Sequence, residues 1–122
     1  MKTNKDPRHL ERIKLMQELF AWNFNEANPL VSESANQIKQ NLHEIDQLIK
    51  NSAPQWPLEK INKIDLAILR LAVFELVFKK NAPPKVIVDE AVELGKEYGS
   101  DSSASFINGA LGKLIADKKI ET

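Results

Sequence analysis

The sequence of 122 residues contains no cysteine, only four glycines, and few aromatic residues: five phenylalanines, two tryptophans and one tyrosine. Without cysteine the chain has no disulfides, no thiolate zinc sites and no cysteine nucleophile. A net charge is also absent, because 17 basic residues balance 17 acidic ones. Nucleic acid would therefore have to bind at a local basic patch, because the whole chain has no net positive charge to attract it. The length fits a single domain over residues 1–122.

Long apolar runs are absent as well. The N-terminus is polar and lacks the apolar core of a signal peptide. The most apolar stretch, residues 64–78, has twelve apolar positions but also three charges, and it is shorter than the roughly 20 residues of a membrane span. These features favour a cytoplasmic protein with no membrane partner.

Patterns typical of enzymes are missing. The only imidazoles are His9 and His43, and on a helix the neighbouring residues 43–46 would diverge rather than share a metal ion. The four glycines are too scattered to cradle phosphates, and no Ser-His-Asp arrangement can be read from the sequence. We therefore expect no catalytic residue, no metal site and no cofactor.

The residues that are present predict helices separated by proline and glycine. Asp6 and Pro7 form a helix start, Ser32 or Ser34 caps the next helix, and Gly99 ends a later one. No alternating strand pattern occurs, so the fold class is all-α, a compact bundle of five or more helices. The expected helical segments are 8–24, 32–51, a short turn at 58–62, 63–81, 81–100, and one from 101 or 102 to about 118.

The segment 64–78 indicates the centre of the bundle. Its three charges, Asp65, Arg70 and Glu75, are spaced so that on a helix they point in three different directions. No continuous polar face remains. This helix is therefore expected to be central or covered by a partner.

Phe106 is the main functional signal. The core side of the last helix is formed by Ile107, Leu111 and Leu114. Phe106 lies on the flank, beside Ser102, Gly109 and Lys113. A flat ring among small residues, near a helix N-terminus, is suited to stacking an unpaired base. The alternative is that Phe106 packs against an adjacent helix.

A second signal is the basic N-terminal segment. Residues 1–14 carry two acidic residues, Asp6 and Glu11, against five basic ones: Lys2, Lys5, Arg8, Arg12 and Lys14. Basic arms of this kind often contact phosphates. The alternative is an ordinary solvated surface.

Together these segments resemble the NusB family. The resemblance rests on "RIKLMQELFAWNF", on "INKIDLAILRLAVFELVF" followed by "PPKVIVDEAVELGKEYGSDSS", and on "FINGALGKL", which occur in the family's order and cover about 80 of the 122 residues. It implies an all-α fold of two small helical subdomains and a transcription antitermination factor. Such factors bind the ribosomal protein NusE and capture boxA-type single-stranded RNA from ribosomal RNA operons. The assembly joins the RNA polymerase elongation complex and promotes read-through.

The resemblance also implies two sets of site residues. The RNA-binding set is Arg8, His9, Arg12, Asp101, Ser102 and Phe106. The NusE-binding set is Asp65 and Glu75. The motif residues Asn108 and Gly109 are expected to be structural.

The chain departs from the family pattern in three places. Ala104 and Ser105 stand where many relatives carry histidine and lysine, the N-terminal arm has fewer arginines, and the region 25–57 is shortened. The first departure should weaken RNA binding. Two alternatives stay open: a helical adaptor or homodimer with little RNA binding, and an RNA-binding module related to the N-terminal domains of ribosomal RNA methyltransferases.

Overall fold

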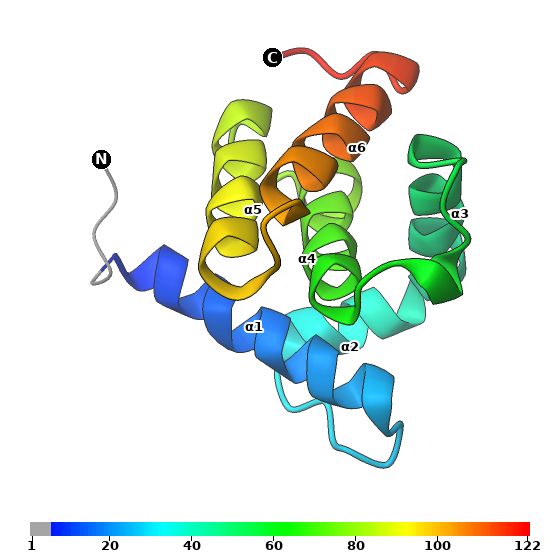
Figure 1. The fold of residues 1–122 in the computed structure, drawn as a ribbon. Coiled ribbons are helices and arrows are strands. Elements are labelled where there is room, and N and C mark those ends of the chain that lie inside the picture. The colour runs from blue at the N-terminus through cyan, green and yellow to red at the C-terminus, as the bar shows by residue number, and fades with distance from the viewer. Residues whose placement is uncertain (1–5) are drawn as a thin grey trace.

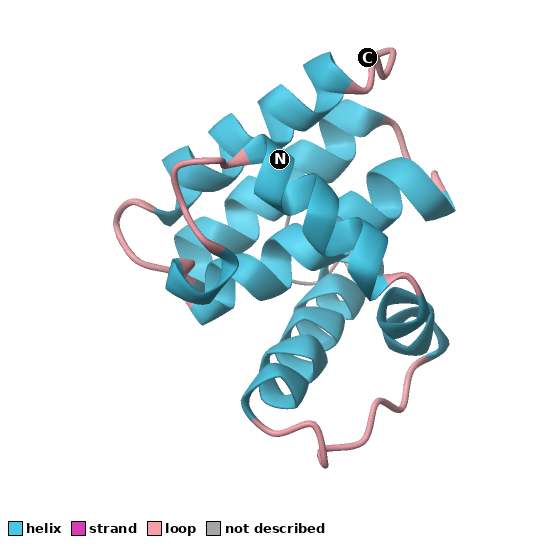
Figure 2. Ribbon diagram, turned by 90° about the vertical axis from the view of Figure 1, so that its right-hand side faces the viewer, coloured by secondary structure: helices cyan, strands magenta, loops and turns pink. Residues whose placement is uncertain are grey.

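The computed structural model describes residues 6–122, which form helices and no strand (Figures 1 and 2). Lys2 and Lys5 of the basic segment lie outside the described residues. The all-α prediction is confirmed. No helix within residues 6–122 is long and apolar enough to cross a membrane. The elements are α1 (Pro7–Phe24), α2 (Glu33–Gln40), α3 (Leu42–Ser52), the 3-10 turn η1 (Leu58–Lys60), α4 (Lys63–Val73), the π-helical turn η2 (Phe74–Lys79), α5 (Pro84–Tyr98) and α6 (Ser103–Asp117).

Two of the predicted helix starts have the expected capping geometry. The Asp6 carboxylate accepts a hydrogen bond from the backbone N–H of Arg8 at 2.9 Å, and Pro7 occupies the first helical position. The hydroxyl of Ser32 accepts from the backbone N–H of Ala35 at 3.1 Å. Local side chains therefore set where α1 and α2 begin.

The helix expected over residues 32–51 is two helices that meet at Asn41. The backbone of Asn41 leaves the helical region, with φ −109° and ψ 16°, and its side-chain amide donates to the carbonyl of Gln37 at 2.8 Å. Asparagine offers the backbone a local partner and so competes with helix continuation. The break lets α2 contact α1 while α3 packs on α4 and α6.

The central position of α4 is confirmed. It contacts α1, α3, α5 and α6, and Figure 1 shows it between α5 and α3. Its side chains are buried without interruption from Asp65 to Val73. A helix with neighbours on every side has no solvent-facing stripe.

The three charges of the central segment are each directed at a different neighbour. Arg70 donates two parallel hydrogen bonds to Asp46 of α3, both 3.0 Å long, and a third to Asn23 of α1 at 3.2 Å. Glu75, at the start of η2, pairs with α1, and Asp65 lies beneath the start of α6. A buried charge needs such a partner because its desolvation costs several kcal/mol.

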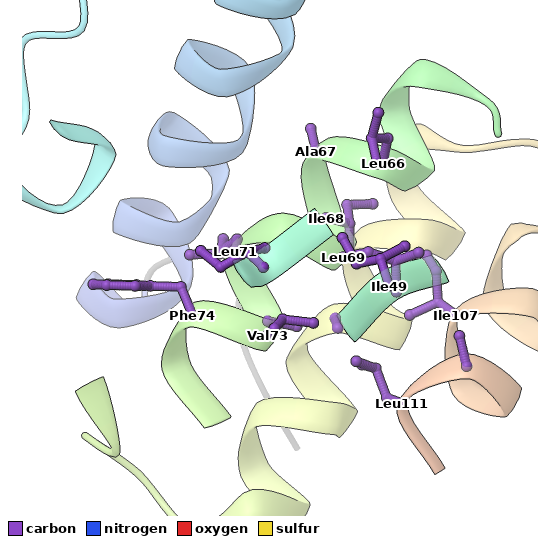
Figure 3. Close-up of a cluster of buried hydrophobic side chains, with 14 of the residues drawn as sticks. Ile49, Leu66, Ala67, Ile68, Leu69, Leu71, Val73, Phe74, Ile107 and Leu111 are labelled. Carbon is purple, nitrogen blue, oxygen red and sulfur yellow. The ribbon is translucent and has the colours of Figure 1, made fainter. Parts of the chain in front are cut away.

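The hydrophobic core takes side chains from α1 to α6, and one part of it lies between α3, α4 and α6. Figure 3 shows Ile49, Leu69, Ile107 and Leu111 pointing toward one another from these three helices. All four are almost completely buried. Each such side chain stabilises the fold by about 1.5–3 kcal/mol relative to an exposed one.

The connection between α5 and α6 depends on the close approach of Gly99 to Ser103. A Cβ at Gly99 would lie 2.3 Å from the Ser103 hydroxyl oxygen, which is too close. That oxygen also accepts a hydrogen bond from the backbone N–H of Ser100 at 2.9 Å. Gly99 is the C-cap that the sequence predicts, but its backbone is extended rather than left-handed. The space needed by Ser103 is the reason for glycine here.

Candidate functional site

The inner face of α1 begins with two charged or polar residues. His9, Arg12, Met16 and Leu19 follow one another at spacings of three, four and three residues, and all four are buried. This is the spacing of a single helical face. The buried stripe of α1 is therefore polar in its first half and apolar in its second.

Arg12 is held by two carboxylates. Its Nε and Nη2 donate to the two oxygens of Glu75 at 2.9 and 2.7 Å, and its Nη1 donates to Glu90 at 3.1 Å. The hydrogen bonds to Glu75, followed by the attraction of Glu75 and Glu90, raise the pKa of Arg12 despite burial, which lowers it. The guanidinium therefore stays charged inside the protein.

His9 joins the start of α1 to α5. Its Nδ1 lies 3.4 Å from an oxygen of Glu90, and its Nε2 lies 3.0 Å from an oxygen of Glu97 in the last turn of α5. The side chain is only 2% exposed. Together with Arg12, Glu75, Glu90 and Glu97, His9 forms what we call the α1 ion cluster.

The α1 ion cluster changes the interpretation of the basic arm. Of the three arm residues in the predicted RNA-binding set, only Arg8 is exposed. Arg12 is not an ordinary solvated surface residue, because its guanidinium neutralises buried carboxylates. Direct RNA contacts of His9 and Arg12 stay a prediction.

A signal for the cluster was present in the sequence. His9 and Arg12 continue the stripe of Met16 and Leu19, and Glu90 lies on the face of α5 that also carries Ile87 and Leu94. A histidine, an arginine and a glutamate on faces that are otherwise apolar indicate an internal ion pair. Sequence reasoning missed this because it grouped the basic residues by position in the chain rather than by helical face.

The second part of the predicted RNA-binding set lies at the start of α6. Asp101 and Ser102 are exposed in the turn that follows α5. The Ser102 side chain occupies the N-cap position without making a capping hydrogen bond, and its hydroxyl lies 3.3 Å from that of Ser100. This turn presents short polar groups to solvent at a helix N-terminus.

Phe106 is half-buried and contacts a second aromatic ring. Its centroid lies 6.5 Å from that of Trp56, with an angle of 83° between the rings. The ring also packs against the hydrophobic core. Phe106 is therefore not sealed inside, and it combines packing with partial exposure.

The two predicted NusE-binding residues are buried. Asp65 is 5% exposed, and one of its carboxylate oxygens has no hydrogen-bond partner within the described chain. Burial raises the pKa of Asp65, and a hydrogen bond with Ser103 partly offsets this. Glu75 is committed to Arg12. Contact of Asp65 and Glu75 with NusE stays a prediction.

The structure joins the two parts of the RNA-binding set only indirectly. His9 ties α1 to Glu97 at the end of α5, and Gly99 places that end against Ser103 at the start of α6. A groove of about 410 Å³ opens beside α1 and is lined in part by Arg8, as well as by residues of α2, η2 and α5. None of the residues that line this groove belongs to α6, so the groove does not reach Phe106.

These features define a small all-helical bundle with an internal ion cluster and a half-exposed aromatic pair beside its last helix. A sequence model described as the NusB family matches residues 3–116. The chain belongs to the NusB family.

Relatives in sequence agree with this. The transcription antitermination protein NusB of Clostridium botulinum, strain Hall, is 49% identical over 78 residues, which are 64% of this chain and 54% of the relative. The protein of the same name from Lachnoclostridium phytofermentans is 49% identical over 80 residues, 66% of this chain and 61% of the relative. The chain thus spans between half and two thirds of the length of these curated relatives.

Solved structures share the fold. T. maritima NusB is 32% identical, with a TM-score of 0.79, over 96% of this chain and 94% of that chain. A structure of the antitermination factors NusB and NusE in complex with dsRNA matches with a TM-score of 0.76 at 20% identity, over 92% of this chain and 99% of that chain. At that identity the second likeness shows the fold alone.

Proposed function

We propose that this protein is a transcription antitermination factor of the cytoplasm. It pairs with NusE and binds boxA-type single-stranded RNA in nascent ribosomal RNA transcripts, and the assembly promotes read-through by RNA polymerase. The observation that carries the proposal is the half-exposed ring of Phe106 beside the N-terminus of α6, in a chain of the NusB family. Such a ring can stack an unpaired base while the helix N-terminus favours a phosphate.

Within this proposal the predicted RNA-binding residues divide into two groups. Arg8, Asp101, Ser102 and Phe106 are accessible and touch the RNA. His9 and Arg12 act through position, because they fix the start of α1 against η2 and α5. Arg8 is thereby held at a fixed place on the surface.

The NusE-binding residues act in a similar way. Asp65 supports the first turn of α6 from below, and Glu75 anchors Arg12. We propose that NusE binds over the surface that these buried residues shape. Substitution of Asp65 or Glu75 would then weaken NusE binding even if neither residue contacts NusE directly.

The test is a titration of fluorescently labelled boxA-type RNA with this protein, with and without NusE. We expect binding that tightens when NusE is added, and a loss of about 1–3 kcal/mol in Phe106→Leu. Phe24→Leu, at an exposed phenylalanine away from α6, is the matched control. Binding of NusE with no RNA binding in either mixture would contradict the proposal.

A specific observation favours the adaptor or homodimer as the second candidate. Ala104 and Ser105 place no cation beside Phe106, while Phe24 and Val31 expose apolar surface at 62% and 83%. A mass measurement in solution distinguishes this candidate. A dimer that binds NusE but not RNA would support it.

A further inference from the structure

Trp56 is a large aromatic residue that no part of the site described so far uses. It is 52% exposed, although tryptophan is usually largely buried. Its ring meets the ring of Phe106 edge to face, at 6.5 Å and 83°. The exposed part of Trp56 therefore lies next to the proposed base-stacking residue.

The turn that carries Trp56 is short and restrained. Prolines at positions 54 and 57 flank it, and the backbone N–H of Trp56 donates to the carbonyl of Ala53 at 3.0 Å. Proline fixes its own φ angle and restricts the residue before it. The backbone that carries the indole is thus restrained before any ligand binds, which lowers the entropy cost of binding.

Beyond the aromatic pair, the exposed surface of α6 carries small and polar residues. Gly109, one turn after Phe106, has nothing within 4 Å of the place where a Cβ would stand, and the same holds for Gly112. Lys113 follows on the same face, with a half-exposed side chain that pairs with Asp117 at 2.8 Å. A single strand can therefore approach the rings over two positions that carry no side chain, with Lys113 beyond them.

We propose that Trp56 is a second RNA-binding residue, whose exposed indole face takes the base next to the one on Phe106. This inference rests on the proposed function. Because the two rings stand nearly perpendicular, two neighbouring bases cannot stay stacked on each other while each lies on a ring. The pair therefore selects an unpaired strand that turns sharply between the two bases, and it rejects a duplex.

The surroundings favour RNA over a protein as the occupant. The centre of a protein interface is a contiguous apolar area. Here the exposed neighbours of Phe106 on α6 are Ser105, Asn108 and Gly109, which are small or polar. A pair of aromatic rings with small or polar neighbours, and with Lys113 further along the same helix, matches the way in which single strands are bound.

The experiment measures binding of labelled boxA-type RNA to the full chain with NusE present. Trp56→Leu keeps an apolar side chain against Phe106 but removes the flat ring, and it should weaken binding about tenfold. Trp56→Phe keeps a ring and should stay within about threefold of the parent protein. Phe24→Leu, which changes an exposed ring that contacts Phe20 and Lys63 instead, should bind like the parent protein.

A direct readout comes from fluorescence. The chain has two tryptophans, and Trp22 is buried. Trp22→Phe therefore leaves Trp56 as the only tryptophan, and its emission should be quenched by the single strand but not by the corresponding duplex. This signal reports on Trp56 even if Trp56→Leu folds poorly.

Three outcomes would overturn the inference, and they differ from one another. If Trp56→Leu binds RNA normally and no quenching occurs while Phe106→Leu is impaired, the proposed function stands and the role of Trp56 does not. If Trp56→Leu loses NusE but keeps RNA, the aromatic pair is a protein surface. If the parent protein binds no RNA with NusE present, the proposed function fails together with the inference.

Discussion

Arg12 shows how a residue that looks like part of a surface arm can be part of the interior. Its guanidinium makes three hydrogen bonds to Glu75 and Glu90, and these replace the water that it loses on burial. Removing Arg12 takes the counter-charge of Glu75 away and leaves Glu90 with one partner fewer inside the protein. The packing of α1 on η2 and α5 is therefore stabilised by Arg12 more than by any exposed lysine.

We expect Arg12→Ala to lower the free energy of unfolding by about 3–5 kcal/mol, because Glu75 and Glu90 would lose their counter-charge inside the protein. Urea denaturation followed by circular dichroism measures the change. Lys14→Ala, at an exposed position one half-turn further along α1, is the control and should shift stability by less than about 0.5 kcal/mol. Equal stability of the two variants would show that the ion cluster is dispensable.

Asp65 gives a prediction for pH. Burial raises the pKa of its carboxyl in the folded state, so the folded protein favours the protonated form. The contribution of Asp65 to stability is then present below the unfolded-state pKa of about 3.9 and is lost as the pH rises through the higher folded-state pKa. Asparagine does not ionise, so Asp65→Asn does not lose stability in this way as the pH rises.

The stability of Asp65→Asn relative to the parent protein should therefore increase as the pH is raised from acidic to neutral. Urea denaturation at a series of pH values measures this difference. Asp89→Asn, at an exposed position on α5, provides the comparison. A difference that falls with increasing pH would mean that the carboxylate of Asp65 is stabilised by its surroundings.

At the scale of elements, the turn between α5 and α6 carries the proposed RNA surface and depends on its glycine. The atoms nearest to a Cβ at Gly99 are the Ser103 hydroxyl at 2.3 Å and the Gly95 carbonyl at 2.8 Å. The carbonyl belongs to the backbone of α5 and cannot turn aside. A side chain at Gly99 would therefore push the start of α6, and Ser102 with it, away from α5.

We expect Gly99→Ala to destabilise the protein by about 1–3 kcal/mol, as overpacking does, and to weaken RNA binding. Gly112→Ala is the matched control, because it adds the same methyl group where nothing lies within 4 Å. Alanine is the better helix former, so the control should gain about 0.5–1 kcal/mol. Thermal unfolding measures whether Gly99→Ala loses stability while Gly112→Ala gains it. A gain of stability in both variants would contradict the close approach of Gly99 to Ser103.

Helix boundaries show what local patterns can and cannot predict. Asp6 and Ser32 cap helices as the sequence indicates, because a cap involves only residues within one turn. The break at Asn41 was missed, because asparagine is also tolerated inside helices, and only the different neighbours of α2 and α3 distinguish the cases.

At the scale of the whole molecule, the balanced charge of the chain conceals an uneven distribution. Arg12, Arg70, Glu75 and Glu90 are buried in the bundle, and the half-buried Asp46 pairs with Arg70. The directions of the three charges in the segment 64–78 could be predicted from helical geometry. Their partners could not, because they lie 24 to 63 residues away in the sequence.

The candidate site was predictable to a similar degree. The partial exposure of Phe106 follows from its place on the flank of α6, and the family resemblance placed Asp101 and Ser102 in the same predicted site. The contact with Trp56 could not be predicted, because no pattern links a turn after α3 to a residue 50 positions later. Contacts between distant segments are fixed by packing rather than by local spacing.

The hydrogen bond between His9 and Glu97 spans 88 residues of sequence and closes most of the chain into a loop. We expect a disturbance of the first turn of α1 to reach the end of α5 through this hydrogen bond, next to the start of α6. We therefore expect a bulky group added before residue 6 to disturb the end of α5 as well as the start of α1. For labels and surface attachment, the exposed residues after α6 are the safer choice.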